Sequence, residues 1–159
     1  MDTVYIETTV VGHLAGRMHP DPIIAARQMA TRAWWSGESS RYRLLVSQAV
    51  IDECSDGDPV AAAERLREIQ WLGLLTPSSA VAALADALIV GKALPASEPQ
   101  DAFHIAIAAV HGVNYLLTWN FKHIANVSVR SRIERVCRDA GFEPPVICTP
   151  EELMETYDA

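Results

Sequence analysis

Short apolar runs alternate along the chain with longer stretches in which apolar and polar residues recur at helical spacing. The apolar runs have the length of buried strands. These predicted strands are Val4–Glu7, Leu44–Ser47, Leu74–Thr76, Val113–Thr118 and Val146–Cys148. Strands that alternate with helices in this way predict an α/β fold, with a mainly parallel sheet covered by helices on both faces.

Capping residues, glycines and prolines set the limits of the predicted helices. Asp58 is typical of an N-cap, and Pro59 suits the first turn that follows it. Ser97-x-x-Gln100 has the form of a capping box, which places Asp101 near the positive end of the next helix dipole. The other predicted helices cover residues 23–35, 48–54, 59–71, 79–94 and 129–140, and a last helix begins at residues 149–152. The helix at 23–35 has a predicted apolar stripe of Ala25, Ala26, Met29, Ala33 and Trp34.

Composition describes one domain, residues 1–159, that is long enough for a substantial core. Half of the residues are hydrophobic and 21% are charged, which is ordinary for a soluble globular protein. No signal peptide is recognised, and Asp86 interrupts the most apolar stretch, so no membrane span is predicted. Cys54, Cys137 and Cys148 lack the spacing of a disulfide framework or a zinc site. We therefore expect a cytoplasmic location.

The formal net charge of −7 bears on the partners of the protein. Proteins that hold nucleic acid mainly through phosphate contacts are usually basic, because neutralising phosphates releases counterions. Strong and indiscriminate binding of nucleic acid is therefore not expected. Catalysis on a phosphodiester stays open, since a bound metal ion supplies positive charge locally.

Oxygen-bearing side chains stand at several strand exits and helix starts. They are Glu7 after the first strand, Glu53 on the short helix after the second, Asp101 at its helix start, and Asn120 just beyond Thr118. Such positions gather on one edge of an α/β sheet, so we expect these side chains to converge. Carboxylates without an obvious cationic partner suggest a hard metal ion.

Each of these residues also has a purely structural interpretation. Asp101 can simply complement the helix dipole, and Glu7 can be a solvated residue at a strand end. Glu53 is favoured over its neighbour Asp52, because helical spacing puts Glu53 on the apolar side. His104, one turn into an apolar helix, is interpreted as a core histidine bonded to a backbone carbonyl rather than as a metal ligand.

One cationic stripe borders the proposed site, and its members are Lys122, His123, Arg130, Arg132, Arg135 and Arg138. It is either a solvated helix face or a rim that guides phosphates, and in the second interpretation Lys122, Arg130 and Arg132 contact RNA. Trp34, Trp35 and Trp71 are interpreted as core or subunit contacts. The chain has no Walker loop and no GxGxxG, GxSxG or HExxH motif, which argues against kinase, dehydrogenase, hydrolase-elbow and zincin chemistry.

Four segments carry the strongest functional signal: Tyr5-Ile6-Glu7-Thr8-Thr9, the helical Glu53, Asp101-Ala102-x-His104-Ile105-Ala106, and Leu116-Leu117-Thr118-Trp119-Asn120. Together they resemble the PIN-domain family over nearly the whole chain. The resemblance implies a three-layer α/β/α sandwich with a mainly parallel central sheet and a metal-dependent ribonuclease site. Single-domain bacterial forms of this kind resemble VapC-type toxins, which pair with an antitoxin protein.

Carried onto this chain, the resemblance assigns metal-binding and catalytic roles to Glu7, Glu53 and Asp101, with Mg²⁺ or Mn²⁺ as the cofactor. Asn120 stands at the usual position of a fourth acid and would bond to a metal-bound water. Thr8 and Thr118 are the neighbouring polar supports. RNA is the implied substrate, an antitoxin is an implied partner, and a homodimer is expected, with the helix of Trp34 and Trp35 as its candidate contact.

Two departures from the family pattern affect the expected chemistry. The family usually has Asp where this chain has Glu7, and it frequently has Asp where this chain has Asn120. Mg²⁺ requires near-ideal octahedral geometry, so a longer and less negative site binds it more weakly, whereas Mn²⁺ accepts more ligand sets. Two other functions stay open: a catalytically weak PIN-like binding module that acts through a protein partner, and a phosphatase or flap-type DNA nuclease with the same metal chemistry.

Overall fold

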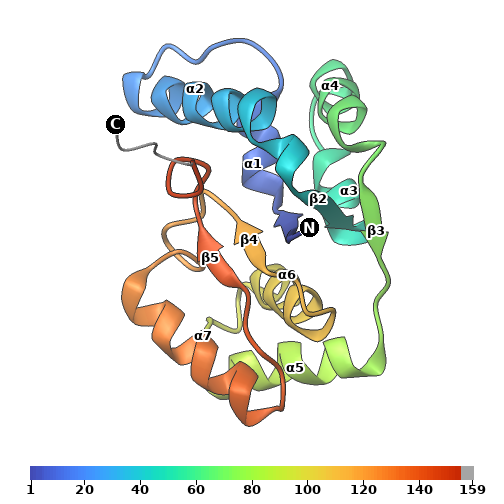
Figure 1. Ribbon diagram of the computed structural model, residues 1–159, viewed down its shortest axis with the longest axis vertical. Helices are drawn as coiled ribbons and strands as arrows, with labels where there is room; N and C mark the ends of the chain where they lie inside the picture. The colour runs from blue at the N-terminus through green and yellow to red at the C-terminus, as the bar shows by residue number, and fades with distance from the viewer. Residues whose placement is uncertain (155–159) are drawn as a thin grey trace.

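The computed structural model describes residues 1–154 and has a sheet of five parallel strands at its centre (Figure 1). The strands are β1 (Thr3–Ile6), β2 (Arg43–Ser47), β3 (Gly73–Leu75), β4 (Tyr115–Leu117) and β5 (Val146–Cys148). Their order across the sheet is β3-β2-β1-β4-β5, and every pairing is parallel. The predicted α/β fold is confirmed, and each predicted strand lies within two residues of an observed one.

Helices cover both faces of the sheet. Within residues 1–154 they are α1 (Thr8–Leu14), α2 (Pro22–Gly37), the 3₁₀ turn η1 (Ser39–Arg41), α3 (Gln48–Cys54), α4 (Pro59–Ile69), α5 (Ser79–Val90), α6 (Pro99–Val110) and α7 (Val127–Asp139). In Figure 1, α1 and α2 lie above the sheet, and α5, α6 and α7 lie below it. This arrangement is the expected three-layer α/β/α sandwich. None of the described helices combines the length and the hydropathy that a transmembrane span requires.

The core is centred on β1 and α6. Val4, Tyr5 and Ile6 of β1 are fully buried, as expected for the middle strand of a parallel sheet covered on both faces. From Ala102 to Ala109 of α6, every residue except Phe103 is buried. The carboxyl end of β1 and the first turn of α6 are thus held by the most tightly packed part of the molecule.

Several helix ends differ from the sequence prediction. The predicted Ser97–Gln100 capping box is wrong, because Glu98 is the N-cap of α6 and makes no side-chain cap hydrogen bond. Asp101 still lies in the first turn. The helix α5 ends at Val90 rather than near residue 94, because Lys92 adopts a left-handed conformation with a φ of 58°.

The expected last helix is only partly described. Thr149 and Glu152 make the reciprocal hydrogen bonds of a capping box, Thr149 N to Glu152 Oε1 and Glu152 N to Thr149 Oγ1. Residues 151–154 form turns, and the remainder of the predicted helix lies outside the described residues.

The apolar stripe predicted for α2 is wrong for most of its residues. Met29 is 64% exposed, and the buried residues of α2 are Gln28, Thr31 and Trp34. Thr31 is buried because its hydroxyl accepts a hydrogen bond from the indole N–H of Trp119 at 2.8 Å. Trp34 belongs to the core and is therefore not a subunit contact, whereas Trp71 is 85% exposed and is not a core residue.

Candidate active site

The candidate site lies at the carboxyl ends of β1 and β4. The chain runs outward from β1 through β2 to β3 on one side, and from β4 to β5 on the other. The strand order therefore reverses between β1 and β4, and ligands of open α/β sheets bind at such a switch point. The residue that follows β1 is Glu7, and its backbone N–H donates to Leu117 O of β4 at 3.1 Å.

Glu7 is buried at the switch point, with 3% of its surface exposed. It is the N-cap of α1, and its Oε1 accepts hydrogen bonds from Thr9 N at 3.1 Å and from the Thr9 hydroxyl. The same oxygen accepts from the Thr118 hydroxyl at 2.7 Å, which joins the ends of β1 and β4. The expectation that Glu7 could be a solvated strand-end residue is wrong.

The two threonines predicted as polar supports differ in their contacts. Thr118 supports Glu7 directly, and its hydroxyl also accepts from Asn120 N at 3.0 Å. The Thr8 hydroxyl is buried and has no hydrogen-bond partner among the described residues. Thr9, rather than Thr8, bonds to Glu7.

Glu53 is held by a chain of hydrogen bonds through the core. Its Oε1 accepts from His104 Nε2 at 2.7 Å, His104 Nδ1 lies 2.6 Å from the Tyr5 hydroxyl, and that hydroxyl lies 2.7 Å from Ser47 Oγ. Because the Glu53 carboxylate can only accept, His104 donates from Nε2, and the hydrogen bonds link Glu53 through the imidazole to Tyr5 and Ser47. His104 is a core histidine as expected, but its partners are side chains rather than a backbone carbonyl.

The three predicted acids surround this one imidazole. His104 bonds to Glu53, and its positive charge when protonated also lowers the pKa of both Glu7 and Asp101. Within residues 1–154, Glu7, Glu53 and Asp101 do not form a group whose ligand atoms all lie within 4.8 Å of one another. The three acids are thus linked through His104, but in the described part of the chain their ligand atoms are not brought together as one group. We call Glu7 and Glu53 the inner carboxylates.

A second group of side chains lies at the start of α6. Glu98, Asp101 and His123 each offer a ligand atom, and these atoms lie within 4.8 Å of one another. Asp101 Oδ2 lies 3.0 Å from His123 Nδ1, and Asp101 Oδ1 accepts from Asn120 Nδ2 at 3.3 Å. We call Glu98, Asp101 and His123 the outer cluster. It is a group that could hold a metal ion.

Burial raises the pKa of one carboxylate in each group, Glu7 among the inner carboxylates and Asp101 in the outer cluster. For Glu7 the rise is opposed by the charge of His104 and by hydrogen bonds from Thr9 and Thr118. For Asp101 the charge of His123 opposes the rise, and the negative charge of Glu98 adds to it. A cation placed among these oxygens would favour their charged forms.

The buried Asp101 oxygen provides the test of whether a metal fits here. Asp101 is 9% exposed, and its buried Oδ2 lies 3.0 Å from His123 Nδ1, which lowers the pKa of Asp101 through its charge and a hydrogen bond. His123 offsets only part of the desolvation of this carboxylate, because burial still raises its pKa. Oxygen ligands that face a carboxylate-rich region suit a divalent cation. The residues present therefore fit a metal ion.

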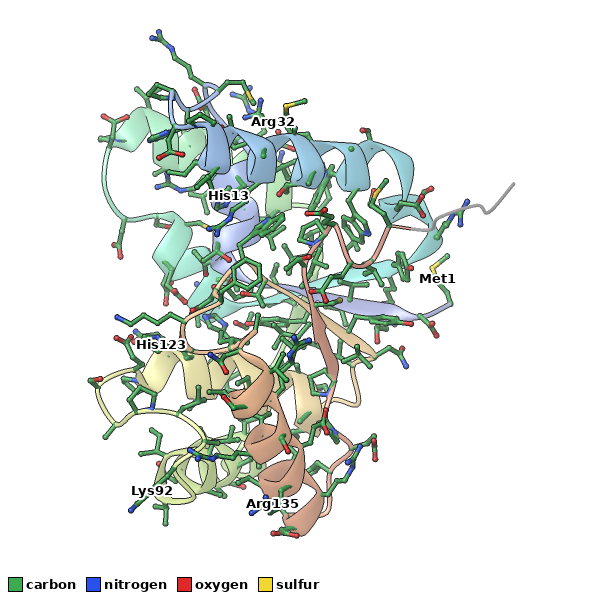
Figure 2. All side chains as sticks on the ribbon, turned by 90° about the vertical axis from the view of Figure 1, so that its left-hand side faces the viewer. Met1, His13, Arg32, Lys92, His123 and Arg135 are labelled. Atoms are coloured by element: carbon green, nitrogen blue, oxygen red, sulfur yellow. The ribbon has the colours of Figure 1, made fainter. Side chains whose placement is uncertain are left out.

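The three residues predicted to contact RNA do not line one cavity. Arg130 lines an open groove of about 670 Å³ together with Trp119, Phe121 and Glu151, and its guanidinium donates to Ile147 O at 3.1 Å. Arg132 lines a separate cavity of about 270 Å³ with Lys92 and Arg135, and Lys122 is exposed. Figure 2 shows Lys92 and Arg135 toward the lower end of the molecule, away from His123.

Sequence reasoning missed several participants in these contacts. Glu98 stands three residues before Asp101 but is not among the predicted ligands, and His123 is predicted only as part of the cationic stripe. Tyr5 was read as a strand residue without a role. A signal existed for Glu98 in its three-residue spacing from Asp101, whereas the contact of His123 depends on the loop after β4.

The comparisons with known proteins give the chain no family. No protein-family model matches the chain, and no curated protein matches it.

Proposed function

We propose that this protein is a divalent-metal-dependent ribonuclease of the PIN-domain type, as the resemblance in its sequence implies. The observation that carries the proposal is the buried Asp101 carboxylate, whose pKa burial raises, grouped with Glu98 and His123 near the switch point of a parallel sheet. A site of this composition is suited to a cation, and the cation is suited to phosphodiester chemistry.

In this proposal Asp101 would hold Mg²⁺ or Mn²⁺, and Glu7 and Glu53 would join it only after their side chains move, because the three acids do not form one ligand group among residues 1–154. A bound ion would lower the pKa of a water molecule and stabilise charge on phosphoryl oxygens. Thr118 and Thr9 orient Glu7, and His104 orients Glu53. Asn120 orients Asp101 through its amide group, so its role is to position that carboxylate as well as to contact water.

The groove beside the site supports single-stranded RNA as the substrate class. Asn120 lies in the chain between Trp119 and Phe121, which line the groove, and Phe121 is 44% exposed. The guanidinium of Arg27 lies 5.1 Å from the centre of the Phe121 ring. Exposed aromatic rings stack on unpaired bases, and nearby arginines contact the backbone of the strand.

A PIN-like binding module is the second candidate function, and the inner carboxylates favour it. Glu7 already accepts three hydrogen bonds through one oxygen, and Glu53 is bonded to His104. Side chains held in this way have fewer free lone pairs for an ion. In this alternative the protein acts through a partner protein such as an antitoxin. A homodimer is proposed for either function, and light scattering of the purified chain tests it.

The deciding experiment compares wild type, Asp101→Asn and Asp86→Asn in Mn²⁺ and in a chelator. Asp86 is an exposed acid on α5, so its variant controls for the loss of one negative charge. We expect wild type and Asp86→Asn to cleave single-stranded RNA only with metal, and Asp101→Asn to lose on the order of 10²- to 10³-fold in rate. Equal cleavage by Asp101→Asn would show that this site is not the catalytic one.

Cleavage assays on other substrates and melting curves with Mn²⁺ separate the rival functions. Faster cleavage of single-stranded DNA or of small phosphate esters than of RNA identifies a flap-type nuclease or a phosphatase. No cleavage of any substrate, together with no rise in melting temperature when Mn²⁺ is added, identifies the binding module.

A further inference from the structure

We propose that Glu98, Asp101 and His123 form a mixed oxygen and nitrogen site that prefers a first-row transition-metal ion to Mg²⁺. The proposal deepens the proposed function, on which it rests for the role of Asp101, and adds two ligands that the family resemblance does not assign. Imidazole nitrogen suits transition metals such as Co²⁺ and Zn²⁺, whereas Mg²⁺ takes oxygen ligands.

The spacing of the ligand atoms fits one ion. Two ligands at right angles on an ion with bonds of about 2.1 Å lie about 3.0 Å apart. Asp101 Oδ2 and His123 Nδ1 lie 3.0 Å apart, the spacing of an ion pair when His123 is protonated. The same spacing suits two neighbouring ligands of one ion, which would replace the proton between them.

Asn120 orients two members of the site at once. Its Nδ2 donates to Asp101 Oδ1 at 3.3 Å, and its Oδ1 accepts from the backbone N–H of His123 at 3.1 Å. The first contact occupies one oxygen of Asp101 and leaves Oδ2 to face His123, and the second holds the backbone that carries the imidazole. Second-sphere contacts of this kind are what orients metal ligands in proteins. An aspartate at position 120 could not donate to Asp101, so the asparagine suits this ligand set.

Glu98 completes the set from the N-cap position of α6. A residue at this position normally uses its side chain to accept a backbone N–H, but the Glu98 side chain makes no cap hydrogen bond. Its carboxylate instead lies within 4.8 Å of the ligand atoms of Asp101 and His123. Figure 2 shows His123 at the edge of the molecule, where an ion can enter from solvent.

Metal titrations of the purified protein test the proposal without any RNA. Calorimetry with Co²⁺, Mn²⁺ and Mg²⁺, and visible absorption with Co²⁺, are compared among wild type, His123→Asn, His123→Asp and Glu98→Gln. His111→Asn is the control, because His111 is an exposed histidine at the opposite end of α6. Circular dichroism checks that each variant is folded.

We expect wild type and His111→Asn to bind Co²⁺ more tightly than Mg²⁺, and His123→Asn to lose about 10- to 100-fold in Co²⁺ affinity. Glu98→Gln loses affinity for both ions, and His123→Asp gains Mg²⁺ affinity relative to Co²⁺. Unchanged Co²⁺ affinity in His123→Asn, or equal affinity of wild type for Co²⁺ and Mg²⁺, overturns the proposal.

The metal titrations and the RNA cleavage assay can fail independently of each other. Co²⁺ binding that depends on His123 in a protein that cleaves no RNA supports the metal site and contradicts the ribonuclease. Metal-dependent RNA cleavage with Co²⁺ binding that is unchanged in His123→Asn supports the ribonuclease and overturns the metal site.

Discussion

The inner carboxylates and the outer cluster lie at the same end of the sheet but differ in how their oxygens are satisfied. Glu7 and Glu53 are bonded to threonines and to His104, and they join β1, β4, α3 and α6. In the outer cluster, the buried Asp101 Oδ2 faces His123 Nδ1 at 3.0 Å, a side chain that could itself ligate a metal ion. The carboxylates thus have similar chemistry but unequal freedom to take a ligand.

This difference suggests a division of labour within one site. A buried carboxylate that accepts several hydrogen bonds stabilises the fold, and removing it leaves donors unpaired. A buried carboxylate whose desolvation is only partly offset is costly to the fold and is retained for ligands. Four substitutions can break or sharpen this comparison.

The largest expected effect is the difference in unfolding free energy between Glu7→Ala and Asp101→Ala. Glu7→Ala removes the cap of α1 and leaves the hydroxyls of Thr9 and Thr118 without their acceptor, so we expect a loss of about 2–4 kcal/mol in the free energy of unfolding. Asp101→Ala removes a buried charge and a favourable dipole contact together, so we expect a change within about 1 kcal/mol. Urea denaturation in chelator measures both, and equal losses would contradict the division of labour.

A smaller effect is expected from Tyr5→Phe, which interrupts the hydrogen-bond chain that holds Glu53. Ser47 and His104 each lose their bond to the Tyr5 hydroxyl, so we expect a loss of about 1–3 kcal/mol in unfolding free energy. Tyr115→Phe, at the start of the neighbouring strand β4, serves as the control. If Tyr5→Phe leaves both stability and RNA cleavage unchanged, the hydrogen bonds from Tyr5 through His104 do not position Glu53.

The smallest expected effect concerns Glu7→Gln and its dependence on pH. The folded-state pKa of Glu7 is raised, so its contribution to stability is present below the unfolded pKa and is lost as the pH rises through the folded pKa. In chelator at neutral pH we therefore expect Glu7→Gln to melt about 2–4 °C above wild type, the shift that ~1 kcal/mol produces.

The difference between Glu7→Gln and wild type is expected to shrink as the pH falls through the raised folded-state pKa of Glu7, and to level off below about 4.3, the usual pKa of glutamate. Added Mn²⁺ is expected to raise the melting temperature of wild type more than that of Glu7→Gln, because only the charged form holds the ion strongly. A Glu7→Gln variant that is less stable than wild type at neutral pH in chelator would show that Glu7 is not strained by its burial.

The local pattern of apolar and polar residues was sufficient to predict the strands, most of the helices, and which face of its helix Glu53 occupies. The strands were predicted from apolar runs, and Glu53 was chosen correctly over Asp52, which is exposed. The cap at Asp58 is confirmed by its bond to Ala61 N. Pattern was misleading on α2, because the buried residues Gln28 and Thr31 are polar and only their tertiary hydrogen bonds make their burial favourable.

By itself, the order of residues determined where strands and helices form and which acids stand at their ends, because turn, cap and periodicity preferences act over a few residues. Only the tertiary structure decided that Glu7 bonds to Thr118, 111 positions away, and that His104 lies between Tyr5 and Glu53. It also decided that His123 meets Asp101 at the start of α6. Such contacts depend on strand order and on the course of a loop, and no local preference encodes the relative placement of distant elements.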